Sequence, residues 1–263
     1  MRVNNKLITA LLSMAVAGGV FASDASDLIS KLSHGQMTVV KSFKSVGNLE
    51  GLVIQPMQGP KQEAIVYVDK DGRYMIPGPL IDASGVNIAQ RDFATQITAV
   101  QAPQIYADVA KTNWVEDGKV DAPHKAYIVV EPNCSACHML YNGLKPMIDS
   151  GQLQVRWIFV AFMNPQSAGM AAAIMQAKDP GKMISMDEKK FNMQTEMGGI
   201  KPVPVSKDRQ DKIKQNLDFM SQAGFVGTPG IIFMGTDGKP QIVRGVPQGP
   251  AVQDMVNHMS NKF

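Results

Sequence analysis

The chain is poor in cysteine, with only Cys134 and Cys137 among its 263 residues. A small exported protein held together by disulfides uses more cysteines at wider spacing, so that class is excluded. A bridge across two intervening residues closes a tiny loop and restricts the unfolded chain very little. A purely structural disulfide would therefore be a poor use of both thiols.

The chain also lacks a strong charge imbalance and a long apolar run. It carries 26 Lys and Arg against 23 Asp and Glu, and aromatic residues make up only 6%. There is no basic tract and no basic face interleaved with aromatics, which excludes nucleic acid as a partner. No apolar stretch reaches the ~20 residues that span a bilayer.

The first residues have the layout of a secretory signal. Arg2 and Lys6 form a short positive segment, and an apolar run of 14 residues, Leu7 to Val20, follows it. Small residues at Val20 and Ala22 then match a signal peptidase site. We expect residues 1–22 to be a cleaved signal peptide rather than a membrane anchor, so the mature chain is exported.

Residues 23–87 read as a small α+β module. A short helix is expected over 24–34, and β structure over 37–82, with a turn at Asp71-Gly72 before the last strand. So small a domain buries little apolar surface, and a partner surface would stabilise it.

A mostly helical linker is expected over 88–113, because apolar residues recur there at helical spacing. A break is predicted at Ala102-Pro103, since proline interrupts a helix. Residues 116–124 then read as a boundary loop.

From residue 114 the pattern predicts a central sheet flanked by helices. The runs 125–130 and 153–161 read as buried strands on either side of a helix that begins at the cysteines, which implies a parallel pair with a right-handed crossover. Residues 165–222 read as a mainly helical insertion. A β-hairpin over 230–245 and a helix over 248–263 complete the domain.

The two cysteines have the spacing of a redox dithiol. Cys134 stands after a strand and at the start of a helix, where the backbone N–H groups and helix dipole favour a thiolate. It is the candidate nucleophile. Cys137 is one helical turn further on, more buried, and placed to resolve a mixed disulfide.

His138 leaves two alternatives open, because C-x-x-C-H is also the attachment signature of a c-type haem. In that interpretation His138 is an iron ligand, but the motif lies between two buried strands rather than in a small helical domain. Metal binding by Cys134, Cys137 and His138 lacks an evident fourth ligand. Otherwise His138 is a partly exposed helix residue that tunes thiol acidity.

Thr228-Pro229 precedes an apolar strand far along the chain. A cis bond there would leave the Thr228 backbone free to pair with an extended substrate, although an ordinary proline at a strand start is the simpler interpretation.

Methionine is abundant in the predicted helical insertion. Thioethers bind Cu(I), but they more often fill irregular cores or adaptable surfaces. The residues concerned are Met163, Met170, Met175, Met183, Met186, Met193 and Met197.

Together these motifs resemble a family. The strand, C-x-x-C and helix with a distant Thr-Pro is similar to a thioredoxin fold, and the signal peptide, β module and linker resemble the periplasmic thiol:disulfide interchange proteins DsbC and DsbG. The stretches "WVEDGKVDAP" (114–123) and "SGQLQVRWIFVAFMNPQSAGMAAAIMQAKDP" (150–180) are similar to DsbG in particular.

The resemblance implies more than the spacing shows. It implies a cystatin-like N-terminal dimerisation domain (23–87), a helical linker (88–113), a thioredoxin-like catalytic domain (114–263) and a homodimer. Pro229 would be cis, with Thr228 touching the substrate backbone. Substrates would be misfolded or oxidised exported proteins, electrons would come from a DsbD-type membrane reductase, and the location would be the periplasm. No cofactor or metal would be needed beyond the dithiol.

One departure from the family pattern concerns the dipeptide between the cysteines. The family carries Pro-Tyr or Gly-Tyr there, whereas this chain has Ser135-Ala136, so its redox poise is not inherited from the resemblance. Small residues are also expected to leave the Cys134 sulfur open. Glu131 falls where the DsbG pattern has an acid; it shuttles a proton to the thiols, or it is a solvated loop carboxylate.

The predicted function is thiol–disulfide exchange on exported proteins, as an isomerase or reductase that could also reduce sulfenylated cysteines. The alternatives are a dithiol oxidase, a dimeric chaperone-like holdase and, more remotely, a c-type haem protein.

Overall fold

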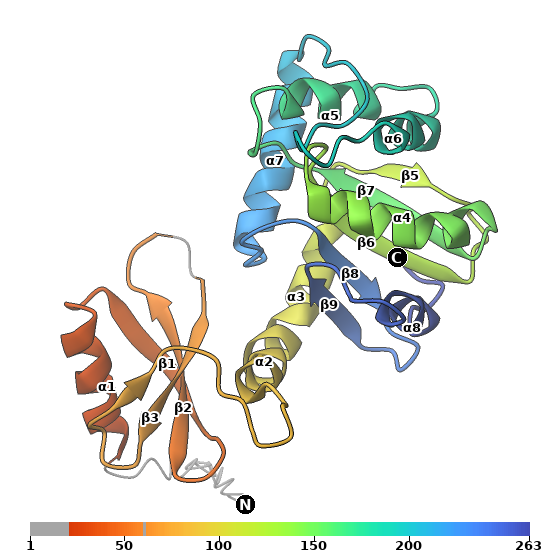
Figure 1. Cartoon of the computed structure of the whole chain (residues 1–263). Helices are drawn as coiled ribbons and strands as arrows, with labels where there is room; N and C mark the ends of the chain where they lie inside the picture. Colours follow the sequence, from red (N-terminus) through yellow and green to blue (C-terminus); the bar gives the residue numbers. More distant parts are fainter. Residues whose placement is uncertain (1–20, 60–61) are drawn as a thin grey trace, which may run out of the picture. The chain divides into compact units, whose positions relative to one another are not determined.

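The structure, a computed structural model, describes residues 21–59 and 62–263 (Figure 1). The predicted signal peptide lies almost wholly outside these residues. The chain divides into two compact units, Met1–Met57 with Ile65–Gly78, and Gln58–Ala64 with Pro79–Phe263. No helix among the described residues has the length and apolar character to cross a bilayer.

The first unit is one helix and an antiparallel sheet. The helix α1 (Phe21–Leu32) packs on a four-stranded sheet of order β1-β2-β3-β4. The strands are β1 (Met37–Lys44), β2 (Leu49–Pro56), β3 (Ala64–Asp69) and β4 (Met75–Ile76). Its buried core is small: Ala25, Ile29, Leu52, Ile54, Val66 and Val68.

The helical segment that follows belongs to the second unit. It comprises α2 (Ile88–Phe93), a π-helical turn η1 (Ala94–Thr98) and α3 (Ala99–Val109). The predicted break at Ala102-Pro103 is wrong, because Pro103 lies inside α3. Pro103 has no N–H to donate to the carbonyl of Ala99, four residues earlier. The widened π-helical turn η1 ends at Thr98, directly before Ala99.

The second unit is built on a five-stranded sheet of order β5-β7-β6-β8-β9. The predicted parallel pair is confirmed: β6 (His124–Val130) pairs with β7 (Leu153–Phe159) from His124 opposite Leu153 to Val130 opposite Phe159. The crossover is α4 (Ser135–Asp149). The predicted hairpin is β8 (Gly230–Met234) and β9 (Pro240–Arg244), with β8 antiparallel to β6.

Two ends of this unit differ from the prediction. The expected loop over 116–124 begins as a strand, β5 (Val115–Asp117). This edge strand pairs antiparallel with β7. The expected helix over 248–263 is only α8 (Ala251–Asn257). After it, Met259 forms a bridge to Gly235, so the chain satisfies its backbone groups against the sheet instead of extending the helix.

Side chains alternate across β6 and so fill two cores. Ala126, Ile128 and Val130 face one core, and Tyr127 and Val129 face the other. The first core is covered by α4, α8 and the insertion helices α5 (Ser167–Met175) and α6 (Pro180–Lys189). The second is covered by α3 and by the C-terminal part of α7 (Lys207–Gln222).

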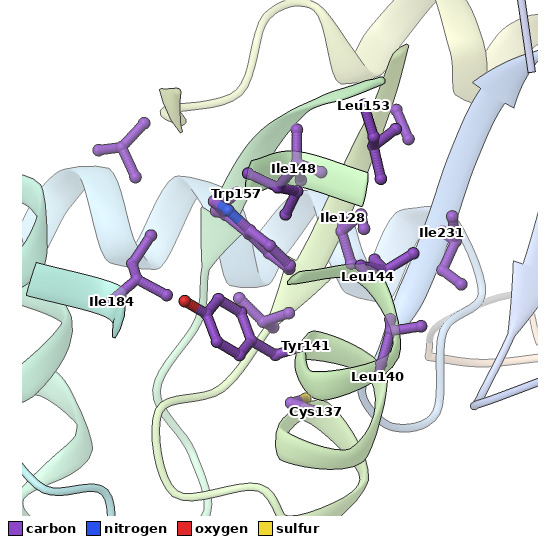
Figure 2. Close-up of a cluster of buried hydrophobic side chains, with 14 of the residues drawn as sticks. Ile128, Cys137, Leu140, Tyr141, Leu144, Ile148, Leu153, Trp157, Ile184 and Ile231 are labelled. Atoms are coloured by element: carbon purple, nitrogen blue, oxygen red, sulfur yellow. The ribbon is translucent and has the colours of Figure 1, made fainter. Parts of the chain in front are cut away.

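The apolar face of α4 holds the helix against the sheet (Figure 2). The predicted stripe of Cys137, Leu140, Leu144, Met147 and Ile148 is buried. The helix ends where Gly151, at φ 77°, donates to Ile148 and Gln152 donates to Met147, the paired bonds of a Schellman motif. The buried stripe therefore fixes α4 on the sheet, with the cysteines in its first turn.

Candidate functional site: a dithiol at the start of a helix

Cys134 is the N-cap residue of α4. Its backbone is extended (φ −101°, ψ 114°), and its Sγ accepts the N–H of Cys137 at 3.3 Å. A short turn places it there, because the N–H of Cys134 donates to the carbonyl of Glu131. The sulfur therefore takes the position in which a serine or aspartate oxygen caps a helix, facing the unpaired N–H groups of the first turn.

These donors make the first cysteine acidic. The Cys134 sulfur accepts hydrogen bonds from the Cys137 thiol, the Thr228 hydroxyl and the backbone N–H groups of Cys137 and Ala136. These hydrogen bonds outweigh the effect of burial and lower the pKa of Cys134 to about 6. Burial and the neighbouring Cys134 charge raise the pKa of Cys137. One thiol is thus held as a thiolate and the other as its hydrogen-bond donor.

The expectation that small neighbours leave Cys134 open is wrong. Cys134 is only 4% exposed. The motif is bordered by the chain between α6 and α7: Ser135 Oγ donates to Glu196 Oε1 at 2.8 Å, and Asn133 Oδ1 accepts the N–H of Gly198 at 3.0 Å. Removing bulk from the dipeptide does not expose the sulfur, because other segments pack around it.

The structure brings Thr228 and Pro229 to the dithiol. The peptide bond between them is cis, and they directly precede β8. Cys134 Sγ lies 3.5 Å from the carbonyl oxygen of Thr228, to which it donates only in its protonated form. The hydroxyl oxygen of Thr228 is buried and has no partner among the described nitrogen and oxygen atoms.

Glu131 is buried beneath the motif and is not a solvated loop carboxylate. It is 1% exposed, and its Oε2 accepts the N–H of Asn133 at 2.7 Å while its Oε1 has no partner within the described part of the chain. Burial raises the pKa of Glu131. Asn133 continues the network, since its amide donates to Ser167 Oγ at 2.9 Å.

His138 makes contacts through both ring nitrogens and through the face of its ring. Its Nδ1 lies 2.7 Å from Glu188 Oε2, and its Nε2 lies 2.9 Å from the amide nitrogen of Asn142. The ring stacks on Phe191 at 4.5 Å between centroids, and burial lowers the pKa of His138. With both nitrogens occupied, His138 is not free to ligate a haem iron.

The arrangement of side chains gives no support to a metal site at the motif or to a copper site among the methionines. Among residues 21–59 and 62–263, no three His, Cys, Asp or Glu side chains gather as metal ligands. The methionines are divided: Met170 is buried in the interior of the protein, Met175 and Met183 pack against the first core, and Met186 and Met193 are exposed.

Sequence reasoning missed Glu188, Glu196, Asn133 and Ser167. The stretch "MDEKK" (186–190) has the composition of an exposed helix face, yet the Glu188 side chain is only 12% exposed. No local signal marks these residues, because they meet the motif only through the tertiary packing of the insertion.

A parallel β-α-β unit followed by an antiparallel hairpin and a helix, with a dithiol at the head of the crossover helix, defines a thioredoxin-like thiol–disulfide oxidoreductase. The chain is similar to the thiol:disulfide interchange protein DsbG of Pseudomonas aeruginosa, with 26% identity over 94% of this chain and 96% of the relative. It is 27% identical to DsbG of Escherichia coli, over 92% and 94% of the two chains. The predicted resemblance and the predicted class of enzyme are thereby confirmed.

Other comparisons are more distant. DsbC of Haemophilus influenzae is 28% identical over 86% of this chain and 88% of its own. Among solved structures, DsbG of Helicobacter pylori matches with a TM-score of 0.39 and 18% identity, over 80% of this chain and 98% of that one. ScsC of Proteus mirabilis matches with a TM-score of 0.46 and 15% identity, over 64% and 87%. No protein-family model matches the chain.

Proposed function

We propose that the chain exchanges disulfides in exported proteins through the thiolate of Cys134. The observation that carries the proposal is the Cys134 sulfur at the N-cap of α4, where it accepts the N–H of Cys137. A thiolate is the attacking species in disulfide exchange, and its stabilisation at a helix start makes it available at neutral pH.

The exchange runs in two steps. The Cys134 thiolate attacks one sulfur of a substrate disulfide, a mixed disulfide forms, and the other substrate sulfur leaves as a thiolate. Cys137 then gives up its proton and attacks Cys134, which releases the first substrate sulfur as a thiolate and leaves a Cys134–Cys137 disulfide. Where a second substrate thiol resolves the mixed disulfide instead, the outcome is isomerisation.

Glu131 and Thr228 have roles in this scheme. Glu131 is buried, has one unpartnered oxygen and a raised pKa, so it accepts the proton that Cys137 loses. The extended backbone of Thr228 before Pro229 pairs with the substrate chain beside the reactive sulfur. His138, which contacts Glu188 and Asn142, tunes the acidity of the thiols and does not bind the substrate.

The wider assignment follows the relatives. The similarity to DsbG and DsbC over most of the chain supports a periplasmic location, misfolded or oxidised exported proteins as substrates, a DsbD-type reductase as electron donor, and a homodimer formed through the N-terminal unit. Reduction of sulfenylated cysteines would use the same two steps.

Replacing the cysteines one at a time tests the roles of the two sulfurs. Cys134→Ser should abolish the reduction of insulin disulfides, because serine offers no thiolate. Cys137→Ser is the matched control, since it keeps the nucleophile and loses only the resolving sulfur, and it should accumulate mixed disulfides with exported proteins on non-reducing gels. Full activity in Cys134→Ser would reject the proposal.

The in-cell redox state separates the reductive and oxidative directions. Alkylation of the thiols followed by a gel shift should show the dithiol reduced. A disulfide held in vivo would support the alternative of a dithiol oxidase.

A holdase activity is the second candidate. Phe162 and Met163 follow β7, and Val226, which is 81% exposed, precedes β8, so apolar side chains are exposed at the end of the strands where Cys134 lies. Suppression of aggregation that survives the loss of both cysteines would support this candidate.

A further inference from the structure

Glu188 and His138 form a partly buried acid–base pair one turn from the nucleophile. His138 directly follows Cys137, and its backbone N–H closes the first turn of α4 onto the carbonyl of Cys134 at 3.0 Å. Its Nδ1 lies 2.7 Å from Glu188 Oε2, on the last turn of α6. The amide nitrogen of Asn142 lies 2.9 Å from Nε2; with this amide as the donor, the ring proton is on Nδ1, facing the carboxyl group.

Within the described part of the chain, His138 is the one basic side chain paired with Glu188. Among the described residues, no lysine or arginine forms an ion pair with Glu188. The titratable groups around it are Asp187 on the same helix, and Cys134, His138 and Tyr141 from the α4 side. Asp187 is itself buried, with its carboxylate bound by the N–H of Ile200 at 3.0 Å.

Burial, then the charges of Asp187 and Cys134, raise the pKa of Glu188 to about 8. The influence of Cys134 is reciprocal, because two interacting charges shift each other's proton affinity by the same free energy. Cys134 carries its negative charge only while the dithiol is reduced. Formation of the disulfide removes that charge, so the proton affinity of Glu188 must fall.

We propose that the Glu188–His138 pair is a proton-holding site coupled to the oxidation state of the dithiol. It binds a proton more tightly when Cys134 is a thiolate and releases it when the Cys134–Cys137 disulfide forms. Glu188 therefore acts on the dithiol only through its charge and is not a catalytic residue. The inference deepens the proposed function and depends on it.

The protons and electrons balance in this scheme. Reduced protein carries the Cys134 thiolate, the Cys137 thiol and protonated Glu188. A substrate disulfide takes two electrons and becomes two thiolates, while the protein dithiol becomes a disulfide. Those thiolates, or the solvent, receive the Cys137 proton together with the fraction of a proton that Glu188 no longer holds.

Redox titration across pH tests the coupling in the full chain. Equilibration with reduced and oxidised glutathione at a series of pH values gives the number of protons released on oxidation. Between pH 7 and 8, where Cys134 is already a thiolate, we expect more than one proton in the wild type and close to one in Glu188→Gln. Equal proton numbers in the two proteins would overturn the proposal.

Glu196→Gln is the matched control, because Glu196 also approaches the motif but through the Ser135 hydroxyl at its surface. Its proton number should follow the wild type. Should Glu188→Gln fail to fold, carbon NMR of the Glu188 carboxyl in the wild type still decides: its titration midpoint should be lower in the oxidised protein and in Cys134→Ser than in the reduced protein. Identical midpoints would contradict the coupling.

The proposed function and this inference fail separately. Retained insulin reduction in Cys134→Ser would overturn the function. Normal exchange with no redox-linked change at Glu188 would overturn only the coupling.

Discussion

At the scale of single residues, the site depends on a sulfur that serves as a helix cap. Cys134 replaces the usual capping oxygen and contacts an N–H of the first turn, while at Cys137, inside the helix, burial and the Cys134 charge outweigh the donors around it and raise the pKa. The same four residues therefore hold one thiol with a lowered pKa and one thiol with a raised pKa. Burial of both sulfurs lengthens the reach of these interactions, because water screens them little.

The alkylation rate of reduced protein should follow the thiolate of Cys134. Its pKa is about 6, below the ordinary value of 9.0, so the thiolate is present above pH 6 and lost as the pH falls through 6. We expect the rate with iodoacetamide to be nearly constant from pH 7 to 8 and to fall about tenfold per unit below pH 6. A midpoint near 9 would show that the helix start does not stabilise the thiolate.

At the scale of elements, the insertion determines the surroundings of the dithiol. The helix α5 is rich in glycine and alanine, and this lets the chain beyond α6 approach it closely: the N–H of Val203 donates to the carbonyl of Gly169 at 3.1 Å. The same chain supplies Glu196 and Gly198 to the motif. Packing of α5 is therefore linked to the active site through one continuous segment.

Two glycine substitutions test this packing. A Cβ at Gly169 would lie 2.6 Å from Pro202 Cβ and 2.9 Å from the Val203 carbonyl oxygen, so Gly169→Ala should lower the free energy of unfolding by about 1–3 kcal/mol. At Gly143 in α4 the nearest atom would be 3.4 Å away, on Val252. Gly143→Ala should instead raise stability by up to about 1 kcal/mol through helix propensity.

Urea denaturation of the reduced proteins measures both effects. A stabilised Gly169→Ala would show that the segment over α5 moves aside at little cost.

At the scale of the whole molecule, the N-terminal unit has a small core, so burial of further apolar surface would stabilise it. One cluster of six buried apolar residues forms its core, and large apolar side chains remain exposed, among them Met57 and Tyr74, the latter 67% exposed. Tyr74 directly precedes the short edge strand β4. Association of two copies would cover such residues and stabilise the unit.

We therefore expect the mature chain to sediment as a dimer, and Tyr74→Asp to shift it toward monomer by placing a charge in the covered surface. Val120→Asp is the control, since Val120 is a comparably exposed apolar residue of the second unit. Sedimentation velocity over a concentration series measures the shift. A wild-type monomer at all concentrations would contradict the proposed dimer.

The local pattern of the sequence determined most of the elements. Alternation and apolar runs identified β6 and β7, helical spacing identified the buried face of α4, and Cys134 marked where α4 begins. These features follow from neighbouring residues, whose periodicity directly reflects which side of an element is buried. The chemistry of the dithiol was readable for the same reason, because both sulfurs lie within one turn.

Tertiary structure alone decided what surrounds the sulfurs. The short strand β5 shows no apolar alternation in the sequence, and it forms because the backbone of β7 is available to pair with it. Glu188 occurs in a polar stretch, and only the packing of α6 against α4 buries it beside His138. Exposure of Cys134 was wrongly predicted from its small neighbours, since segments distant in sequence enclose it. Burial and charge coupling are sums over the whole fold, so no short stretch of sequence contains them.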